Sequence, residues 1–100
     1  MAADKPKPPE PTFSESDLDV RRKRLRFRSW HRGTREADLL VGRFADAYLK
    51  QFDQWQLDRF EALLEMSDPD LYNWVSEREP VPDEFKSDVM ELFINNHKLA

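Results

Sequence analysis

The spacing of apolar residues beyond the first dozen positions predicts helices along the whole chain. Apolar residues recur every three or four positions, which is the period of one face of an α-helix. Four such stripes are present: Ala37, Leu40, Val41, Phe44 and Tyr48; Leu57, Phe60, Leu63 and Leu64; Leu71, Trp74 and Val75; and Phe85, Val89, Leu92 and Phe93. No sustained alternation of apolar and polar residues, the pattern of a half-buried strand, accompanies them. We therefore expect an all-α protein.

A more polar helix is predicted ahead of these stripes, from about Asp17 to Trp30. Its apolar residues fall on opposite faces, with Leu18 and Leu25 on one and Val20, Phe27 and Trp30 on the other. Two interpretations stay open. Either one face joins the core while the other meets a partner, or the helix lies in a groove and is buried on both sides. In either case the prediction is a compact, single-domain bundle of five short helices over residues 17–97.

Glycine and proline positions suggest where these helices end. Gly33 lies where a glycine commonly closes a helix, after the first predicted helix. Asp68 before Pro69 fits an N-cap followed by proline at the first helical position, where the missing N–H costs nothing. Pro80 and Pro82 are expected to end the fourth helix and to start the fifth.

Residues 1–16 are predicted to form a disordered, proline-rich tail. Four of the seven prolines lie there, at Pro6, Pro8, Pro9 and Pro11, and proline removes helix donors and favours extended neighbours. The remaining domain is small, so it has little room to enclose a cofactor. Function is expected on its surface.

The composition offers few groups for catalysis. The absence of cysteine excludes disulfides, thiolate metal sites and thiol nucleophiles. His31 and His97 are the only histidines, too few for a zinc site or a catalytic triad. No apolar run approaches the ~20 residues of a membrane span, and the N-terminus resembles neither a secretory signal nor a mitochondrial transit peptide. We expect a cytoplasmic, bacterial, monomeric protein that is not an enzyme and has no membrane or metal partner.

The net charge of −4 conceals a strong asymmetry. Residues 21–35 contain eight basic side chains and no acidic one, whereas residues 36–100 contain fifteen acids and six bases. The basic run fits a solvated face that pairs with acids on neighbouring helices, or a surface for an acidic protein partner. Phosphate binding is a third interpretation, which the acidic remainder of the chain disfavours.

Two segments stand out beyond the helical pattern. In the first, residues 30–36, Gly33 can adopt a positive φ and leaves backbone open to a partner. Arg32 offers a planar fork of donors suited to a carboxylate or phosphate, and Glu36 lies in the first turn of a helix. Alternatively, Gly33 only closes a helix, and Arg32 and Glu36 pair with each other. In the second segment, residues 68–74, capping and packing explain Asp68, Pro69, Leu71 and Trp74, and they explain Tyr72 least well.

These two segments resemble a known family. Arg32-Gly33-Thr34-Arg35-Glu36 matches the RGxxE motif of the succinate dehydrogenase FAD assembly factors. Leu63-Leu64-Glu65 and Asp68-Pro69-Asp70-Leu71-Tyr72-Asn73-Trp74 match the second common block of that family, in order and at the expected distance. The resemblance covers about residues 20 to 96.

The resemblance implies a five-helix fold and a function as an assembly factor. It implies a partner, the flavoprotein subunit of succinate dehydrogenase and often that of fumarate reductase, in which FAD becomes attached to a histidine. No FAD is expected to bind stably to this chain, which has no glycine-rich phosphate loop after a strand. An antitoxin-like or nucleic-acid-binding module that uses the basic first helix is the alternative. The expected partner-binding residues are Trp30, His31, Arg32, Gly33, Arg35, Glu36, Asp68, Pro69, Asp70 and Tyr72.

Overall fold

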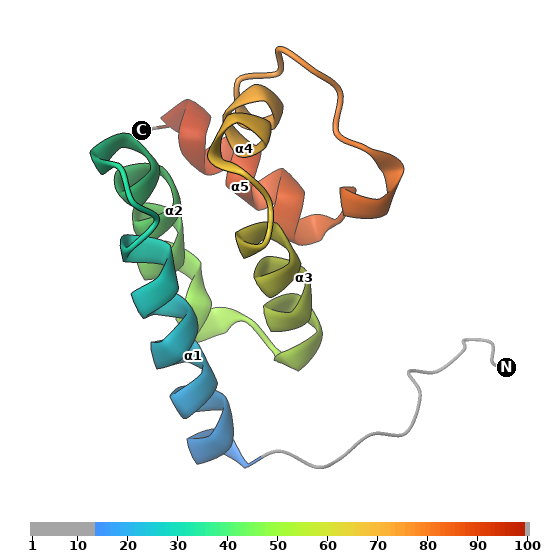
Figure 1. Cartoon of the computed structure of the whole chain (residues 1–100). Helices are drawn as coiled ribbons and strands as arrows, with labels where there is room; N and C mark the ends of the chain where they lie inside the picture. The colour runs from blue at the N-terminus through green and yellow to red at the C-terminus, as the bar shows by residue number, and fades with distance from the viewer. Residues whose placement is uncertain (1–13, 100) are drawn as a thin grey trace, which may run out of the picture.

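Five α-helices and two short 3-10 helices make up the chain in a computed structural model that describes residues 14–99 (Figure 1). In order they are α1 (Glu15–Trp30), α2 (Arg35–Tyr48), η1 (Leu49–Gln51), α3 (Gln54–Leu64), α4 (Asp68–Val75), η2 (Asp83–Phe85) and α5 (Asp88–Leu99). The described residues contain no strand. The predicted all-α class with five short helices is confirmed.

The helices pack around a core of aromatic and aliphatic side chains. α1 contacts both α2 and α3, and α5 contacts α2, α3 and α4 (Figure 1). Phe44 of α2 is fully buried and lies at the meeting point of three helices. Its ring centroid is 5.7 Å from that of Phe60 in α3 and 5.1 Å from that of Phe93 in α5. Tilted and edge-on ring pairs at such distances add about 0.5–1.5 kcal/mol each beyond their area burial.

The predicted apolar stripes form this core. Their central members are buried: Ala37, Val41, Phe44, Leu57, Phe60, Leu63, Leu64, Leu71, Trp74, Val75, Val89 and Phe93. The remaining members, Leu40, Tyr48, Phe85 and Leu92, are partly buried against it. Burying one large apolar side chain stabilises a fold by about 1.5–3 kcal/mol. The stripes therefore account for most of the driving force that holds the helices together.

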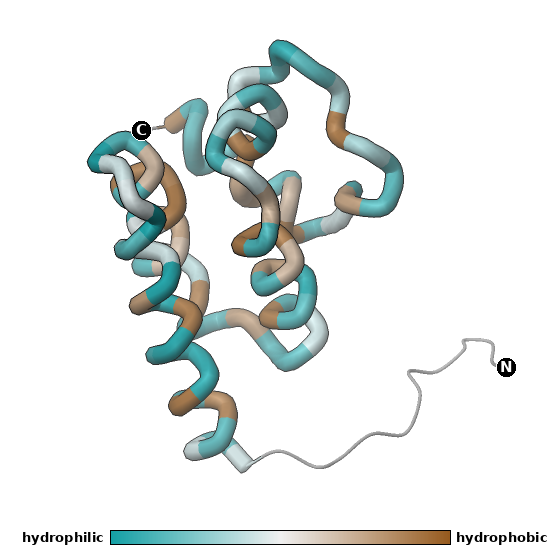
Figure 2. The backbone as a smooth tube through the Cα atoms, viewed as in Figure 1, coloured by the Kyte–Doolittle hydropathy of each residue, from teal (hydrophilic) through white to brown (hydrophobic). Residues whose placement is uncertain are grey.

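α1 is buried on one side only. Leu25 is buried and Leu18 packs partly against the core, whereas Val20 and Phe27 are 53% and 63% exposed. In Figure 2, α1 is a mostly hydrophilic helix with isolated hydrophobic positions. This excludes the interpretation in which both faces of α1 are buried.

The ends of α1 differ from the prediction by a few residues. α1 begins at Glu15, two residues before the expected start, because Ser14 and Asp17 form a capping box. In this box the Ser14 side chain accepts a hydrogen bond from the Asp17 N–H, and the Asp17 side chain accepts one from the Ser14 N–H. Of the tail predicted for residues 1–16, residues 1–13 lie outside the described range, while residues 14–16 belong to the cap and first turn of α1. At the other end the C-cap is His31, and Gly33 follows two residues later with a φ of +121°.

The boundaries of α4 also differ from those predicted. Its N-cap is Ser67 instead of Asp68, because the Ser67 hydroxyl accepts the Asp70 N–H at 3.2 Å. α4 ends at Val75, well before Pro80. Glu77 adopts a positive φ of 62°, and the N–H groups of residues 78 and 79 both donate to the Asn73 carbonyl. These bonds end the helix through its own backbone, so the prolines follow the turn without causing it.

A glycine inside α2 allows α1 and α2 to approach each other. Gly42 is buried, and a Cβ added there would lie 2.7 Å from Cε3 of the Trp30 ring and closer still to Cδ2 and Cε2. Such an approach is far below van der Waals contact. The flat indole therefore packs directly on the backbone of α2, which fixes the end of α1 against the middle of the next helix.

We predict that Gly42→Ala destabilises the protein, although alanine is about 1 kcal/mol more favourable than glycine in a helix. Overpacking against Trp30 should dominate, with a net loss of about 1–2 kcal/mol in the free energy of unfolding measured with urea. In a Trp30→Ala background the same substitution should become stabilising, since the ring is gone. A destabilisation of equal size in both backgrounds would show that contact with Trp30 is not the cause.

Candidate partner-binding site

The loop between α1 and α2 is held by hydrogen bonds to its backbone. The Arg32 N–H donates to Oδ1 of Asp38 at 2.6 Å, and the Gly33 N–H lies 3.4 Å from the same oxygen. Thr34 then caps α2 by accepting the Ala37 N–H at 3.2 Å. The positive φ of Gly33 favours glycine, while a Cβ there would meet no atom within 4 Å. Gly33 is thus required for backbone conformation and leaves open space beside it.

The guanidinium of Arg32 connects this loop to the junction of α3 and α4. Nε and Nη2 lie 2.9 and 2.8 Å from Oδ1 of Asp68. Nη1 and Nη2 also donate to the carbonyl oxygens of Leu64 and Met66, each at 2.6 Å. The Arg32 side chain is only 10% exposed. A lysine ammonium could not reproduce this arrangement, because the three acceptors match the planar fork of arginine.

This arrangement changes the expected role of Arg32. Its fork was expected to engage a partner, or to pair with Glu36; it pairs with Asp68 and with two carbonyl groups of the same chain. The interpretation in which Arg32 pairs with Glu36 on the surface is therefore wrong. The reason lies in the fold, which places the start of α4 beside the α1–α2 loop. The two segments singled out in the sequence come together through Arg32 and Asp68.

Tyr72 and Glu36 make a second connection between these segments. The Tyr72 hydroxyl donates to the backbone carbonyl of Glu36 at 3.5 Å, and the Tyr72 ring meets the ring of His97 edge-on. This explains Tyr72, which capping and packing had left unexplained. The carboxylate of Glu36 is exposed and forms no ion pair within the described residues, as is also true of the Arg35 guanidinium. Both groups remain free to contact another molecule.

Trp30 and His31 flank the loop on its α1 side. The Trp30 indole donates to Oδ1 of Asp46 at 3.3 Å, and Nε of Arg26 donates to the same oxygen at 2.6 Å. The Arg26 hydrogen bond, with a smaller effect from Trp30, lowers the pKa of Asp46 despite the opposing effect of its partial burial. His31 is exposed and stacks on Phe27, with ring centroids 3.9 Å apart, while its Nδ1 lies 2.6 Å from the Phe27 carbonyl oxygen.

The predicted residues of the second segment are not equally accessible. Asp68 is engaged by Arg32, and Asp70 is partly buried in the first turn of α4. Pro69 between them is exposed. The accessible surface around the junction therefore consists of the loop residues, Pro69 and the start of α2.

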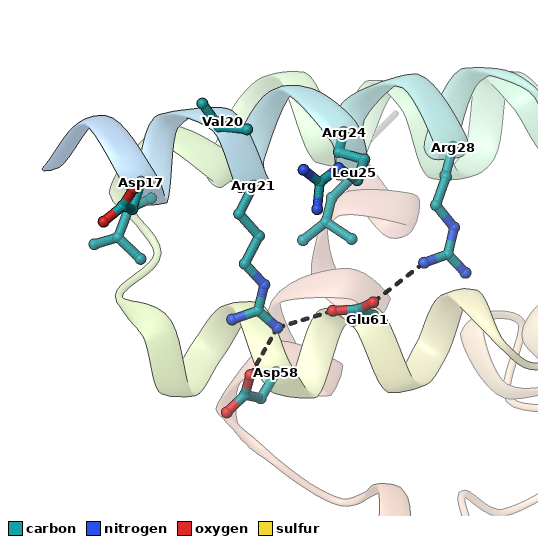
Figure 3. Close-up of a pocket in the computed structure, with 9 residues that line it drawn as sticks. Asp17, Val20, Arg21, Arg24, Leu25, Arg28, Asp58 and Glu61 are labelled. Atoms are coloured by element: carbon teal, nitrogen blue, oxygen red, sulfur yellow. Dashed lines mark hydrogen bonds and ion pairs between the residues drawn. The ribbon is translucent and has the colours of Figure 1, made fainter. Parts of the chain in front are cut away.

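Most of the basic run in α1 is neutralised by neighbouring acids. Nη2 of Arg21 lies 2.6 Å from Asp58 and 2.8 Å from Glu61, while Arg28 reaches Glu61 and Glu65. Figure 3 shows both arginines extending from α1 toward Glu61 on α3. The interpretation as a face that pairs with acids on neighbouring helices is confirmed for these positions.

Two further arginines of α1 also bind within the chain. Arg22 donates to the carbonyl oxygens of Leu49 and Phe52, at 3.0 and 2.8 Å, and pairs with Asp19. Arg26 pairs with Asp46. Lys23 and Arg24 form no ion pair among the described residues.

The sequence pattern did not identify Asp38, Gly42 or Asp46. Asp38 accepts both loop N–H groups, Gly42 admits the Trp30 ring, and Asp46 binds Trp30 and Arg26. Gly42 could have been identified from the sequence, because a glycine inside a strongly helical segment destabilises the helix and is usually kept for close packing. The two aspartates gave no signal among so many acids. Over residues 14–99, no group of side chains suited to a metal ion is found, and no helix has the length and apolar character needed to cross a membrane.

We predict that Arg32→Ala lowers the free energy of unfolding by about 2–3 kcal/mol, since charged hydrogen bonds at a nearly buried site are lost. Arg32→Lys should recover less than half of this loss. Asp68→Asn and the double variant complete a cycle, measured by urea unfolding, with an expected coupling of about 1–2 kcal/mol. Additive single effects would contradict a direct Arg32–Asp68 interaction.

Comparison with known proteins places these features in a family. Residues 23–97 match the family described as "Flavinator of succinate dehydrogenase". The chain is 36% identical over 86 residues to the FAD assembly factor SdhE of Acetobacter pasteurianus, an alignment that covers 86% of this chain and 79% of that protein.

Mitochondrial proteins are also similar. The chain is 38% identical over 77 residues to succinate dehydrogenase assembly factor 2, mitochondrial, of Dictyostelium discoideum, covering 77% of this chain and 55% of that protein. It is 42% identical over 73 residues to the protein of the same name from Debaryomyces hansenii, covering 70% and 51%. The chain thus spans about half the length of these two relatives. Because the family match extends over most of the chain and the bacterial relative is matched over more than two thirds of its length, this chain belongs to the family of succinate dehydrogenase flavinators.

Proposed function

We propose that this chain is an assembly factor that binds the flavoprotein subunit of succinate dehydrogenase and promotes covalent attachment of FAD to it. The family match and the names of its relatives support this function. The observation that supports it most directly is the Arg32 fork, which joins the two segments of the family resemblance into one surface. Arg32 acts as a positioning residue in this proposal.

The accessible groups on that surface are those that would meet the partner. Gly33 leaves open space beside the loop, and Glu36 presents a carboxylate without an ion pair in the described chain. An acidic side chain is favourable in the first turn of a helix such as α2. A desolvated, directional contact to Glu36 would then fix the orientation of the flavoprotein on the factor. Arg35 and Pro69 would lie at the edge of this interface.

The factor would act by binding and orienting, with FAD held by the partner. Attachment requires the partner histidine close to the flavin, and orientation alone can supply several kcal/mol of a reaction barrier. A factor that binds the competent arrangement more tightly raises its population by that difference in affinity. No catalytic group and no stably bound FAD are assigned to this chain.

Several details stay predictions. They are that the chain also binds a fumarate reductase flavoprotein, that it is a monomer and that it is located in the bacterial cytoplasm. The alternative, an antitoxin-like or nucleic-acid-binding module, is not supported by the family match. Four arginines of the basic helix are also neutralised within the chain.

We predict that Glu36→Ala reduces covalent flavin on the co-expressed flavoprotein at least tenfold, which corresponds to about 1.4 kcal/mol of lost interaction. The readout is in-gel flavin fluorescence in cells that lack the native factor. Urea unfolding should be nearly unchanged, because the Glu36 side chain is exposed.

Glu84→Ala is the matched control, since Glu84 is an exposed carboxylate on η2, away from the loop. It should retain full flavinylation. Normal flavinylation by Glu36→Ala would exclude this carboxylate from the interface. Equal flavinylation with and without the factor would refute the proposed function itself.

A further inference from the structure

The outer face of α1 exposes apolar surface that the rest of the described chain avoids. Only three large hydrophobic side chains between residues 14 and 99 are exposed: Val20, Phe27 and Leu99. Two of them lie on α1, seven residues apart, which places them two turns apart on one face of the helix. Phe27 is 63% exposed and is held by stacking on His31 at 3.9 Å. A fixed, exposed aromatic ring loses little conformational freedom on binding.

The two cations of α1 that lack ion pairs lie on the same face. Lys23 and Arg24 fall between Val20 and Phe27, and neither forms an ion pair among the described residues. In Figure 3, Arg24 lies between Arg21 and Arg28, and the dashed lines start from Arg21 and Arg28 but not from Arg24. The unneutralised charge of α1 is thus confined to Lys23 and Arg24.

The strip is continuous with the proposed partner site. It consists of Val20, Lys23, Arg24, Phe27 and His31, and His31 directly precedes Arg32. Shallow depressions beside Phe27 and His31 are lined by Lys23 and Arg26 on one side, and by Gly33 and Arg35 on the other. One partner could therefore contact the strip and the loop together.

We infer that this outer strip of α1 is a docking surface for an acidic segment of the flavoprotein that also presents an apolar pocket for Phe27. The inference rests on the proposed function and extends it. Phe27 would supply most of the binding energy, because energetically dominant interface residues are typically aromatic and surrounded by polar contacts. Lys23 and Arg24 would select an acidic partner and accelerate association.

A nucleic acid is a poorer occupant of this strip. Affinity for a phosphate backbone grows with the number of cations that neutralise phosphates, and the strip offers only two unpaired cations, Lys23 and Arg24. The other four arginines of α1 are already paired with acids of the same chain, so they would have to leave those acids to reach a phosphate.

The test is the binding kinetics of the full chain with purified flavoprotein subunit that lacks covalent flavin, at two salt concentrations. Phe27→Ala should weaken binding about 30-fold, mainly through faster dissociation. The pair Lys23→Glu and Arg24→Glu should slow association and remove its decrease with salt. Circular dichroism and urea unfolding should match those of the unmodified chain, since all three side chains are exposed.

Two controls match these variants. Leu99→Ala removes the other exposed large hydrophobic side chain, and Arg43→Glu reverses an exposed, unpaired cation of α2; both should bind as the unmodified chain does. Binding by Phe27→Ala within twofold of the unmodified chain would overturn the inference while leaving the proposed function standing. The inference would also be overturned if the strip variants changed self-association or nucleic-acid binding but left flavoprotein binding unchanged. Failure of the unmodified chain to bind the flavoprotein would refute the proposed function, and the inference with it.

Discussion

Arg32 joins the α1–α2 loop to the start of α4, where its partner Asp68 lies 36 residues further along the sequence. Its guanidinium donates to acceptors at the α3–α4 junction, while its backbone N–H is held by Asp38 of α2. Asp68 provides charge, and the carbonyls of Leu64 and Met66 would otherwise be open acceptors at the end of α3. The loop that precedes α2 and the start of α4 are joined through this one group. Because the fork of arginine is planar and rigid, it sets the relative position of these elements as well as joining them.

Charge in α1 is used in two different ways. Its arginines on the flanks of the helix form partly exposed ion pairs with α3 and a hydrogen bond to a backbone carbonyl of η1. Exposed ion pairs stabilise a fold little individually. Their main effect is to neutralise the basic run, which leaves Lys23 and Arg24 as its unpaired cations in the described chain. The same helix therefore joins the bundle through one side and presents a limited charged and aromatic strip on the other.

The sequence predicted four of the five helices from apolar stripes with the period of an α-helix, because periodicity is a local property. The N-cap of α4 was displaced by one residue, since Ser67 and Asp68 are chemically similar candidates, and the start of α1 was displaced by two. The partner of Arg32 was not predictable, because the contact with Asp68 exists only after α3 and α4 have packed. The family motifs singled out two segments that the fold brings together, and Arg32, one of the expected binding residues, is the residue that joins them.

Amide hydrogen exchange in the Arg32→Lys variant tests this account most directly. The amides of Asp38 and Leu71 donate to Thr34 and Ser67 carbonyls in the first turns of α2 and α4, the two elements that Arg32 joins. The Leu57 amide makes the equivalent bond to Asp53 in the first turn of α3 and serves as an internal reference. If Arg32 holds the junction, exchange should accelerate about tenfold or more at Asp38 and Leu71 through local opening, with Leu57 unchanged. Unchanged exchange at all three amides, or equal acceleration at Leu57, would contradict the central role of Arg32.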